Sequence, residues 1–270
     1  MMKILITGAG SYIGMSLAEY LARWPEAYQV DTLDMQQESW ADADFGGYDA
    51  VFHVAGIAHI RETAENAPLY YRVNRDLAIE TARKAKEAGV HQFVFLSSMS
   101  VYGVDQGPLD PMTTPEPKSN YGKSKLQAEE GITALRDESF AVAVLRPPMV
   151  YGPGCKGNYR SLQKIAKIAP VFPDYENIRS MISMENLADF VKQTLDSRAD
   201  GLFCPQDPEY VCTCRMIRDI AGENGKNLPL LKVLNPAVVL AKKFTGMGRK
   251  AFSDLYYTKS QGNEGQNGEA

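Results

Sequence analysis

The chain has 270 residues, a formal net charge of -4 and 44% hydrophobic residues, which are ordinary values for a globular protein with a large core. Its acidic balance gives no electrostatic footprint for nucleic acid or an anionic membrane, and no apolar run reaches the roughly 18 to 20 residues that span a bilayer. The four cysteines lack the paired spacing of a zinc site, and the residues before the first predicted strand do not predict a secretory leader. We therefore expect reduced thiols, a cytoplasmic location and a small-molecule partner.

The first strand and helix frame a glycine-rich turn. A buried strand is predicted over Lys3–Thr7, and a helix follows from Tyr12 to Trp24. Gly8, Gly10 and Gly14 lie around this turn, where glycine lets backbone approach a ligand and helix N-terminal amides attract phosphate. The spacing G-x-G-x-x-x-G is one residue longer than the dinucleotide-binding fingerprint, so a glycine turn with nothing bound remains an alternative at this point.

The second predicted strand, Val30–Leu33, ends in an acidic residue that strengthens the dinucleotide interpretation. Asp34 follows Gly14 by twenty positions, where a carboxylate can accept both ribose hydroxyls of an adenosine. Residues 35–37 include no arginine for a 2′-phosphate. The sequence therefore predicts a pyrophosphate seat for NAD(H) and favours it over NADP(H).

Strand and helix patterns continue to alternate as far as residue 145. The further strands and helices are predicted over Tyr48–Val54, Tyr70–Ala88, Gln92–Leu96, Tyr121–Leu135 and Ala141–Leu145. Strands that are apolar throughout need cover on both faces. We therefore expect an α/β fold, a Rossmann-type doubly wound parallel sheet with a smaller C-terminal lobe.

The pattern loosens after residue 152, where prolines and glycines accumulate. We assign residues 1–152 to an NAD-binding Rossmann domain, with a stretch near 180–196 returning to it, and residues 153–258 mostly to a substrate-binding lobe. Helices are predicted over Asn186–Leu195 and Arg215–Glu223. Residues 259–270 are polar and glycine-rich, so a disordered tail is expected there.

Two short motifs carry the predicted chemistry, SSMSVYG from Ser97 to Gly103 and YGKSK from Tyr121 to Lys125. Tyr121 and Lys125 are four residues apart on a predicted helix, so their side chains share one face. A free tyrosine has a pKa of about 10, which a neighbouring positive charge lowers by roughly one to three units. Lys125 and a nicotinamide cation could together make Tyr121 a working base, while Ser98 fixes the same substrate oxygen. A Y-x-x-x-K match alone is typical of a solvated helix start, and the preceding glycine turn, Asp34 and serine make chance a poor explanation.

Six motifs occur in one order along the chain: TGAGSYIG, the VAG of Val54–Gly56, Asn74 in YYRVNRD, SSMSVYG, YGKSK and RPPMVYGPG. In this order they resemble the extended short-chain dehydrogenase/reductase family over residues 3–244. Within it the chain is most similar to bacterial nucleotide-sugar epimerases and 4-keto-sugar reductases of surface-polysaccharide synthesis.

The resemblance implies a catalytic set made of Ser98, Tyr121, Lys125 and Asn74. Tyr121 would exchange the proton of the sugar 4-hydroxyl, Lys125 would hold the nicotinamide ribose, and Asn74 would support Lys125. The implied NAD contacts are Gly8, Gly10, Ser11, Tyr12, Ile13, Gly14, Asp34, Val54, Ala55, Gly56, Lys125 and Pro148. Ser11 occupies the usual middle glycine position of the family loop, which leaves the phosphate contact there open, although Gly10 beside it could allow the same approach.

The resemblance also implies a nucleotide-sugar substrate, for which we expect a uridine diphosphate carrier. The substrate contacts it implies are Ser98, Ser100, Tyr121, Asn158 and Arg179. A guanidinium such as that of Arg179 can hold a diphosphate bidentately. A homodimer through the helices carrying Asn74 and Lys125 is expected as well.

The motifs argue against one reaction of the family and leave two others open. Family dehydratases have an acidic pair just after the catalytic serine or threonine, and Met99 and Ser100 stand there instead, so a dehydratase is not expected. An NAD-dependent 4-epimerase is favoured over an NAD(P)H-dependent 4-ketoreductase. The reductase stays open, because Met149 stands where many epimerases have an asparagine.

A different class of protein also stays open, a dinucleotide-binding regulator or scaffold without catalysis. Such relatives often lack the tyrosine or the lysine, and this chain has both. The three histidines, His53, His59 and His91, form no cluster in the sequence, so no metal site is expected.

Overall fold

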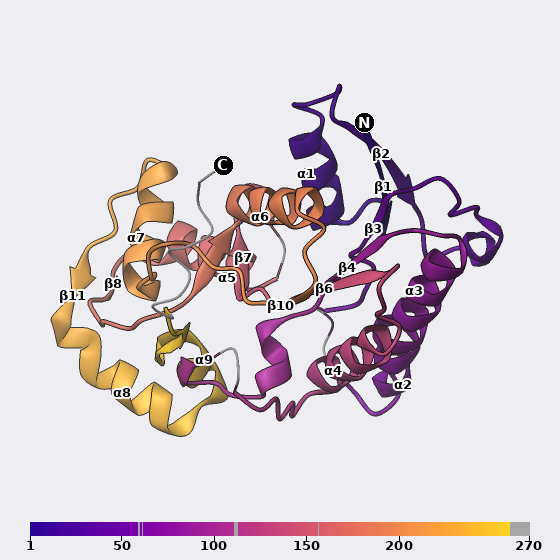
Figure 1. The fold of residues 1–270 in the computed structure, drawn as a ribbon. Coiled ribbons are helices and arrows are strands. Elements are labelled where there is room, and N and C mark those ends of the chain that lie inside the picture. Colours follow the sequence, from indigo (N-terminus) through magenta and orange to yellow (C-terminus); the bar gives the residue numbers. More distant parts are fainter. Residues whose placement is uncertain (59, 61, 111–112, 156, 260–270) are drawn as a thin grey trace. The chain divides into compact units, whose positions relative to one another are not determined.

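The computed structural model describes residues 1–58, 60, 62–110, 113–155 and 157–259, and the predicted tail from 260 onward lies outside this range. The chain divides into two compact units (Figure 1). Unit 1 comprises Met1–Val104, Pro115–Ser161 and Met181–Asp207. Unit 2 comprises Asp105–Thr114, Leu162–Ser180 and Pro208–Ala270.

Unit 1 is built on a six-stranded sheet. Its strands, in spatial order, are β10 (Gly201–Phe203), β6 (Ala141–Leu145), β4 (Gln92–Leu96), β3 (Ala50–His53), β1 (Met2–Thr7) and β2 (Tyr28–Leu33). Every neighbouring pair is parallel. The chain runs outward from β1 to β2 in one direction and then from β3 to β10 in the other. This order confirms the predicted Rossmann-type doubly wound sheet.

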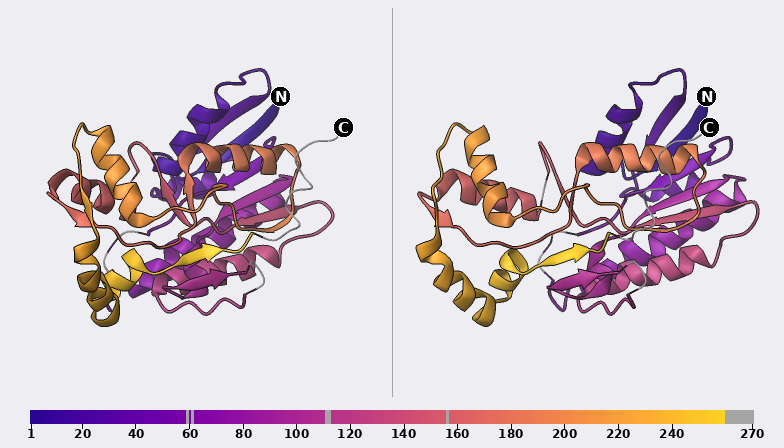
Figure 2. Two further views of the ribbon diagram at one scale, coloured as in Figure 1. Left: turned by 90° about the vertical axis from the view of Figure 1, so that its left-hand side faces the viewer. Right: turned by 60° about the vertical axis from the view of Figure 1, so that its left-hand side comes forward.

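Two layers of helices cover the two faces of this sheet (Figure 2). The helices are α1 (Tyr12–Leu21) and α6 (Met184–Asp196) on one face, and α3 (Leu77–Glu87) and α4 (Asn120–Thr133) on the other. Successive residues of a strand point to opposite faces. Ile4 and Ile6 therefore pack with Leu17, whereas Leu5 packs with Ala78. Both faces are apolar, which explains why these strands lack polar alternation.

The helix predicted over Tyr70–Ala88 is interrupted in the structure. It consists of α2 (Ala67–Tyr70), a π-helix η2 (Tyr71–Asp76) and α3. A π-helical turn inserts an extra residue per turn and is frequent at functional sites. Asn74, one of the predicted catalytic residues, lies in this segment and is buried.

The shorter elements of unit 1 join the main strands and helices. They are the 3₁₀ helices η1 (Glu38–Asp42) and η3 (Met99–Tyr102), and the parallel pair β7 (Met149–Tyr151) and β9 (Met181–Ser183). Helix α5 (Asn158–Ile168) begins in unit 1 and continues into unit 2.

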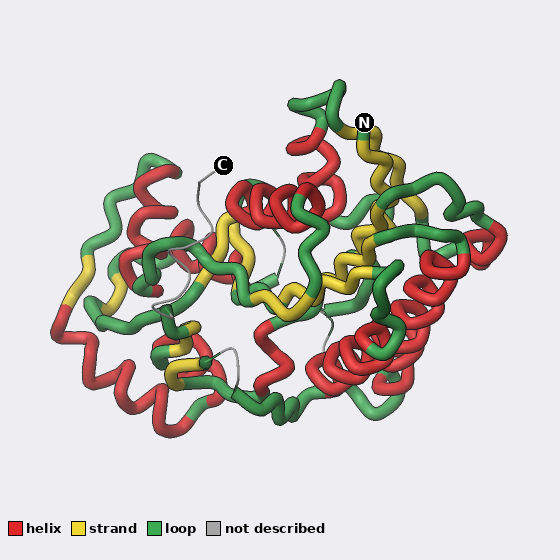
Figure 3. The backbone as a smooth tube through the Cα atoms, in the orientation of Figure 1, coloured by secondary structure: helices red, strands yellow, loops and turns green. Residues whose placement is uncertain are grey.

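Unit 2 is formed by short strands and helices (Figure 3). Its strand pairs are β5 (Gly107–Leu109) with β12 (Leu255–Tyr257) and β8 (Phe172–Pro173) with β11 (Leu230–Leu231), both parallel. Its other elements are α7 (Thr213–Glu223), η4 (Lys232–Leu234), α8 (Asn235–Phe244) and α9 (Gly246–Phe252). A buried amide anchors α7, because Asn177 Oδ1 accepts from Thr213 N at 2.9 Å.

The four cysteines are free thiols in the structure. No helix in the described ranges is both long enough and apolar enough to cross a membrane. Within the same ranges, no three His, Cys, Asp or Glu side chains come together as metal ligands, and His59 lies outside them.

Candidate active site

The predicted site residues of unit 1 follow the carboxyl ends of the parallel strands. Gly8 comes after β1, Asp34 after β2, Val54–Gly56 after β3 and Ser98 after β4. In an open doubly wound sheet, ligands bind beyond these strand ends, where the strand order reverses. That reversal lies between β1 and β3, so the sheet brings the glycine turn and the residues after β3 to this position.

The glycine turn is held against the end of β2. The amides of Gly8 and Ala9 donate to Leu33 O at 2.8 and 3.0 Å, which places the turn beside Asp34. Gly8 has a φ of 122°, and a Cβ there would lie 2.9 Å from Ala55 N. Any larger residue would be strained and would push the turn away from β3.

Ser11 has a definite structural role at this turn. It is the N-cap of α1, and its hydroxyl accepts from Gly14 N at 3.1 Å. A Cβ on Gly10 would meet nothing within 4 Å, so open space lies beside that residue. The serine therefore caps the helix while Gly10 leaves room for a ligand, and the phosphate contact at this turn stays a prediction.

Tyr12 and Ile13 begin α1 and are half-buried. The Tyr12 hydroxyl donates to Pro153 O at 2.9 Å, which ties the glycine turn to the RPPMVYGPG segment. Burial, followed by the neighbouring Cys155, raises the pKa of Tyr12, so its phenol stays protonated and keeps this bond. Pro148 is buried in the same segment.

The Asp34 carboxylate is half-buried just after β2. Its oxygens accept from Gln36 N at 2.9 Å and from Gln37 Nε2 at 3.4 Å. Residues 35–37 supply no cation beside it. The group is fixed next to the glycine turn as an acceptor, which suits a diol and opposes an added phosphate.

Lys125 lies on the buried face of α4. Its ammonium donates to Leu96 O at 2.8 Å and stands 4.6 Å from the centre of the Phe95 ring. Burial lowers the pKa of Lys125 to about 8, and the nearby Glu129 opposes this shift. The ammonium therefore stays mainly charged at pH 7.

Tyr121 and Ser98 meet because the start of α4 packs closely on η3. Gly122 makes this possible, since a Cβ there would lie 2.6 Å from Ser100 O. The Ser98 hydroxyl also donates to Ser100 Oγ at 3.1 Å. Burial raises the pKa of Tyr121, a hydrogen bond with Ser98 lowers it, and Tyr70 raises it further. The chain alone therefore keeps the phenol protonated, and the predicted acidification by Lys125 with a nicotinamide stays a prediction about the loaded site.

Asn74 connects the loop after β3 to α4. Its amide nitrogen donates to Ile57 O at 3.0 Å and to Ser124 Oγ at 3.2 Å, while its oxygen accepts from Ile57 N at 2.8 Å. A Cβ on Gly56 would lie 3.0 Å from Asn74 Oδ1 and 3.4 Å from Lys125 Nζ. The asparagine and the lysine thus flank one point of the backbone, which places them in the same small space.

Glu62 is a site residue that the sequence pattern did not reveal. Its carboxylate accepts from the backbone amides of Asn120 and Tyr121 at 3.0 and 3.1 Å. A carboxylate is favourable at a helix N-terminus, and here it fixes the turn that carries Tyr121. The contact joins residues 58 and 59 positions apart, so no local motif could have indicated it.

The sequence pattern also did not reveal a buried ion pair, between Glu129 on α4 and Arg146. Arg146 Nη2 lies 2.5 Å from Glu129 Oε2, Ser97 donates to the same carboxylate, and Arg146 Nη1 donates to Tyr102 Oη at 3.1 Å. Glu129 follows Lys125 by one helical turn. This cluster, the Glu129–Arg146 pair with Ser97 and Tyr102, anchors α4 to the ends of β4 and β6.

His53 ends β3 within the apolar layer beside Lys125. Its Nδ1 shares a hydrogen bond with Thr7 Oγ1 at 2.8 Å, and its Nε2 has no partner among the described residues. Burial, with a smaller contribution from Lys125, lowers the pKa of His53 to about 3. The imidazole is therefore neutral at physiological pH.

Two predicted substrate contacts have other surroundings within their own units. Asn158 is exposed at the start of α5. Arg179 belongs to unit 2, where its Nη1 donates to the carbonyls of Lys250 and Ser253 at 2.8 and 3.1 Å. Its guanidinium therefore already has a structural task within that unit.

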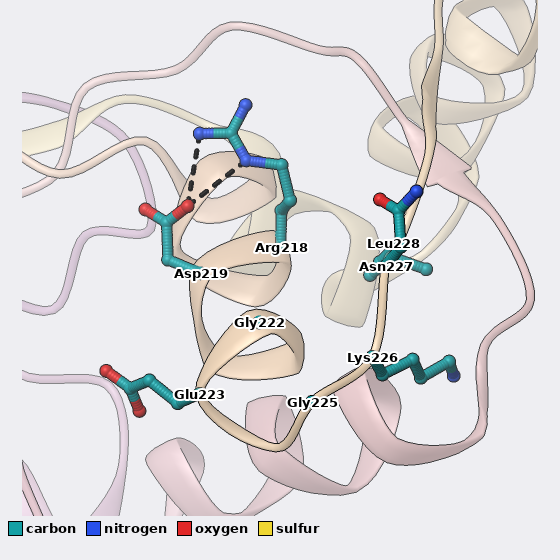
Figure 4. A pocket seen from close by; sticks show the side chains of 8 residues that line it. All are labelled: Arg218, Asp219, Gly222, Glu223, Gly225, Lys226, Asn227 and Leu228. Atoms are coloured by element: carbon teal, nitrogen blue, oxygen red, sulfur yellow. Dashed lines mark hydrogen bonds and ion pairs between the residues drawn. The ribbon is translucent and has the colours of Figure 1, made fainter.

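Unit 2 also has a hollow of about 560 Å³ at the end of α7 (Figure 4). Its lining residues are Arg218, Asp219, Gly222, Glu223, Gly225, Lys226, Asn227 and Leu228. Arg218 and Asp219 form an ion pair, and Lys226 Nζ donates to carbonyls at the end of α5. None of the predicted site residues lines this hollow.

The fold and the cluster in unit 1 define a dinucleotide-binding protein of the short-chain dehydrogenase type. The sequence model of the NAD dependent epimerase/dehydratase family matches residues 4–199, and the chain belongs to that family. NAD is the cofactor of the family. The residues fit this cofactor. Open space lies beside Gly10, and the Asp34 carboxylate has no cation beside it in residues 35–37. The Lys125 ammonium is fixed by its hydrogen bond to Leu96 O.

Two curated relatives are epimerases. The chain is 30% identical over 245 residues to a UDP-glucose 4-epimerase of Vibrio cholerae, an overlap of 81% of this chain and 75% of the relative. It is 28% identical over 260 residues to an N-acetyl-α-D-glucosaminyl-diphospho-ditrans,octacis-undecaprenol 4-epimerase of Escherichia coli O157:H7, covering 88% of this chain and 77% of the relative.

Solved structures show the same fold at low sequence identity. The UDP-glucuronic acid 4-epimerase of Bacillus cereus in complex with NAD superposes with a TM-score of 0.73 and 19% identity, over 96% of this chain and 90% of that one. Solved sugar-nucleotide reductases share the fold as well. The architecture is therefore common to both reactions and does not separate them.

Proposed function

We propose that this protein is an NAD-dependent nucleotide-sugar 4-epimerase that acts on a UDP-linked hexose. The observation that carries the proposal is the arrangement of Tyr121, Ser98 and Lys125 at the strand ends of unit 1. The 30% identity to the Vibrio cholerae UDP-glucose 4-epimerase supports the reaction and the UDP-linked substrate.

In the proposed reaction, bound NAD⁺ supplies a reversible hydride acceptor. Tyr121, as the phenolate predicted for the loaded site, would take the 4-hydroxyl proton as the C4–H bond breaks, which would leave a 4-keto sugar. After the sugar turns over and C4 regains its hydride on the opposite face, Tyr121 would give the proton back to the oxygen. The net change is inversion at C4, with no consumed reductant.

Each remaining side chain has a task in this proposal. Ser98, whose hydrogen bond lowers the pKa of Tyr121, would hold the substrate oxygen between hydroxyl and phenol. Lys125 holds the nicotinamide ribose and contributes positive charge. Asn74 fixes the backbone beside Lys125 through Ile57. Ser100 would contact the sugar.

Residues 153–258 are proposed to supply most of the substrate lobe. Asn158 and Arg179 remain our proposed contacts for the nucleotide diphosphate. Because Arg179 Nη1 is engaged with two carbonyls, its other nitrogen donors would meet the ligand. We further propose a cytoplasmic homodimer through the helices that carry Asn74 and Lys125, which sedimentation of the purified protein would test.

The conversion of UDP-glucose and UDP-galactose, without added cofactor, tests the proposed reaction. Tyr121→Phe should lower kcat by roughly 10² to 10⁴, the range for a lost acid–base group, while the folded state persists. Tyr20→Phe is a matched control, since it removes one phenol oxygen that donates to Asp189 on the neighbouring helix α6 and is not a predicted site residue. Equal loss in both variants would argue against a special role for Tyr121.

A 4-ketoreductase is the alternative reaction, and Met149 is the feature that favours it. An epimerase returns its hydride and retains NAD, whereas a reductase exchanges its cosubstrate after each turnover. Denaturing the purified protein and measuring released NAD(H) separates the two. Near-stoichiometric dinucleotide supports the epimerase, and an empty site supports the reductase.

A lipid-linked hexose is the second candidate substrate. The relative from Escherichia coli O157:H7 is named for a sugar on an undecaprenyl diphosphate, and it aligns with 88% of this chain. Both carriers present a diphosphate next to the sugar, so the C4 chemistry would be unchanged. Parallel assays with UDP-N-acetylglucosamine and with the same sugar on a short polyprenyl diphosphate would distinguish them.

A further inference from the structure

The segment of unit 2 from η4 through α8 to α9 exposes large apolar side chains. Val233 is 78% exposed, Phe244 69% and Met247 83%, and Val239 and Leu240 are also exposed. Single exposed apolar residues are common, but five within fifteen positions indicate a surface that is covered in use. We call these five residues, with Lys232, Lys243, Arg249 and Lys250, the α8–α9 surface.

Positive charge accompanies these apolar groups. Residues 224–253 contain six lysine or arginine residues and no aspartate or glutamate, in a chain whose net charge is -4. Lys226 donates to backbone carbonyls, and Lys242 donates to the Tyr175 hydroxyl. Lys232, Lys243, Arg249 and Lys250 are exposed and form no ion pair with any described carboxylate.

The corner between α8 and α9 is a fixed feature of unit 2. Thr245 caps α9 by accepting from Gly248 N at 2.8 Å, and its own hydroxyl donates to Ala241 O at 2.9 Å. A side chain on Gly248 would collide with the Ala241 carbonyl, so the two helices pack directly. Phe244 and Met247, on either side of the cap, are presented outward by this packing.

We propose that the α8–α9 surface docks onto anionic phospholipid membranes. Helices of ten and seven residues are too short to span the hydrocarbon layer, but exposed apolar side chains interspersed with cations suit the interface. Phe244 and Met247 would enter the acyl boundary, and the lysine and arginine stems would extend so that their charges meet lipid phosphates.

A nucleic acid or a second copy of the chain would match fewer of these exposed side chains than a membrane would. A nucleic acid would match the cations but not Val233, Phe244 and Met247. A second copy seated on the same surface would set cation against cation, which opposes association. The net charge of the whole chain predicts no membrane footprint, and the proposal departs from that prediction only for the local positive charge of residues 224–253. The inference is independent of the reaction at Tyr121.

Vesicle co-sedimentation of the full chain tests the proposal. The vesicles are phosphatidylcholine alone or phosphatidylcholine with 30% phosphatidylglycerol, each at low and high salt. We expect binding to the anionic vesicles at low salt, little binding to phosphatidylcholine, and weakening as salt rises. Equal binding to both vesicle types, or none, would overturn the proposal.

Matched variants assign the binding to these residues. Lys232→Gln, Lys243→Gln and Arg249→Gln together should weaken it about a hundredfold, from about fivefold per cation. Phe244→Ser with Met247→Ser should weaken it by about tenfold or more. The control for the charge variant combines Arg83→Gln, Lys164→Gln and Lys167→Gln, which change the net charge by the same amount at exposed positions outside the α8–α9 surface. The control for the apolar variant is Ile168→Ser, because the Ile168 side chain is 79% exposed and also lies outside that surface.

The controls should bind as the unmodified protein does, and all variants should retain bound dinucleotide and their thermal unfolding temperature. Equal weakening by the control triple would mean a general charge effect and would contradict the assigned surface. If the Phe244 and Met247 variant instead turns a dimer into a monomer and leaves vesicle binding unchanged, the surface is a protein interface and the proposal is wrong.

Discussion

The two units of the protein place their charged and apolar side chains in opposite ways. Unit 1 buries a lysine, a glutamate and an arginine at the ends of its strands, and unit 2 exposes phenylalanine, methionine and valine at a helical corner. Buried charges cost stability unless they are paired, and exposed apolar groups gain nothing in water. The buried lysine of unit 1 fits the NAD of its family, and the exposed apolar residues of unit 2 are where we propose a lipid surface.

The largest expected effect on stability comes from breaking the ion pair of unit 1. Glu129→Gln leaves Arg146 buried without its carboxylate, and such losses cost about 3 to 5 kcal/mol. Urea unfolding should show this decrease. Glu129→Gln combined with Arg146→Met should recover a large part of it, because no unpaired charge remains. A double variant as unstable as the single one would mean that the pair is not what the substitution disrupts.

Asp34→Ala should weaken NAD binding without unfolding unit 1. Hydrogen bonds to charged groups contribute about 1.5 to 3 kcal/mol, which corresponds to roughly 10- to 150-fold in affinity. Calorimetric titration of NAD into stripped protein measures this change. Asp31→Ala is the matched control, since it removes a carboxylate of β2 that accepts from Tyr48 and is not a predicted cofactor contact. Unchanged NAD affinity in Asp34→Ala would exclude the diol contact.

His53 predicts a loss of stability in acid. Its folded pKa of about 3 lies below the unfolded value of 6.5, so the unfolded chain binds an extra proton as pH falls through 6.5. This proton uptake lowers the free energy of unfolding by about 2 kcal/mol at pH 5 relative to pH 7. The loss grows until pH approaches 3. Urea unfolding at several pH values should show a shallower dependence in His53→Phe. An identical slope in both proteins would place the acid sensitivity elsewhere.

The smallest expected effect is at the cap of α1. Ser11→Ala removes the acceptor for Gly14 N and should cost about 1 kcal/mol of stability. Ser11→Gly, which restores the family glycine at this position, should cost only a few tenths. Both variants should still bind NAD, because open space remains beside Gly10. Loss of binding in Ser11→Gly would show that the hydroxyl contacts the cofactor.

Much of unit 1 follows from local sequence. Strands such as Gln92–Leu96 and Ala141–Leu145 are apolar on both faces, so their position and their parallel arrangement could be predicted with the bounds observed. The helix over Tyr70–Ala88 was predicted as one piece, because a π-helical turn has no simple periodic signature. Helices α8 and α9 were missed because their apolar residues face outward rather than toward a core.

The contacts that complete the candidate site depend on tertiary structure. Glu62 reaches the start of α4 across 58 residues, and Glu129 meets Arg146 across 17, so neither pair could be found from spacing. The cap made by Ser11 was within reach of the sequence, since a serine just before a helix is the usual N-cap. In the family motif the same position is read as a missing glycine, which does not indicate the cap.

The central claim is that hydride leaves C4 of a sugar and returns to it within one active site. UDP-glucose deuterated at C4 tests it most directly, by mass spectrometry and NMR of the UDP-galactose formed in ordinary water without added cofactor. The account predicts conversion with the deuterium retained at C4. Conversion with deuterium lost to solvent, or at an unchanged rate in Tyr121→Phe, would contradict it.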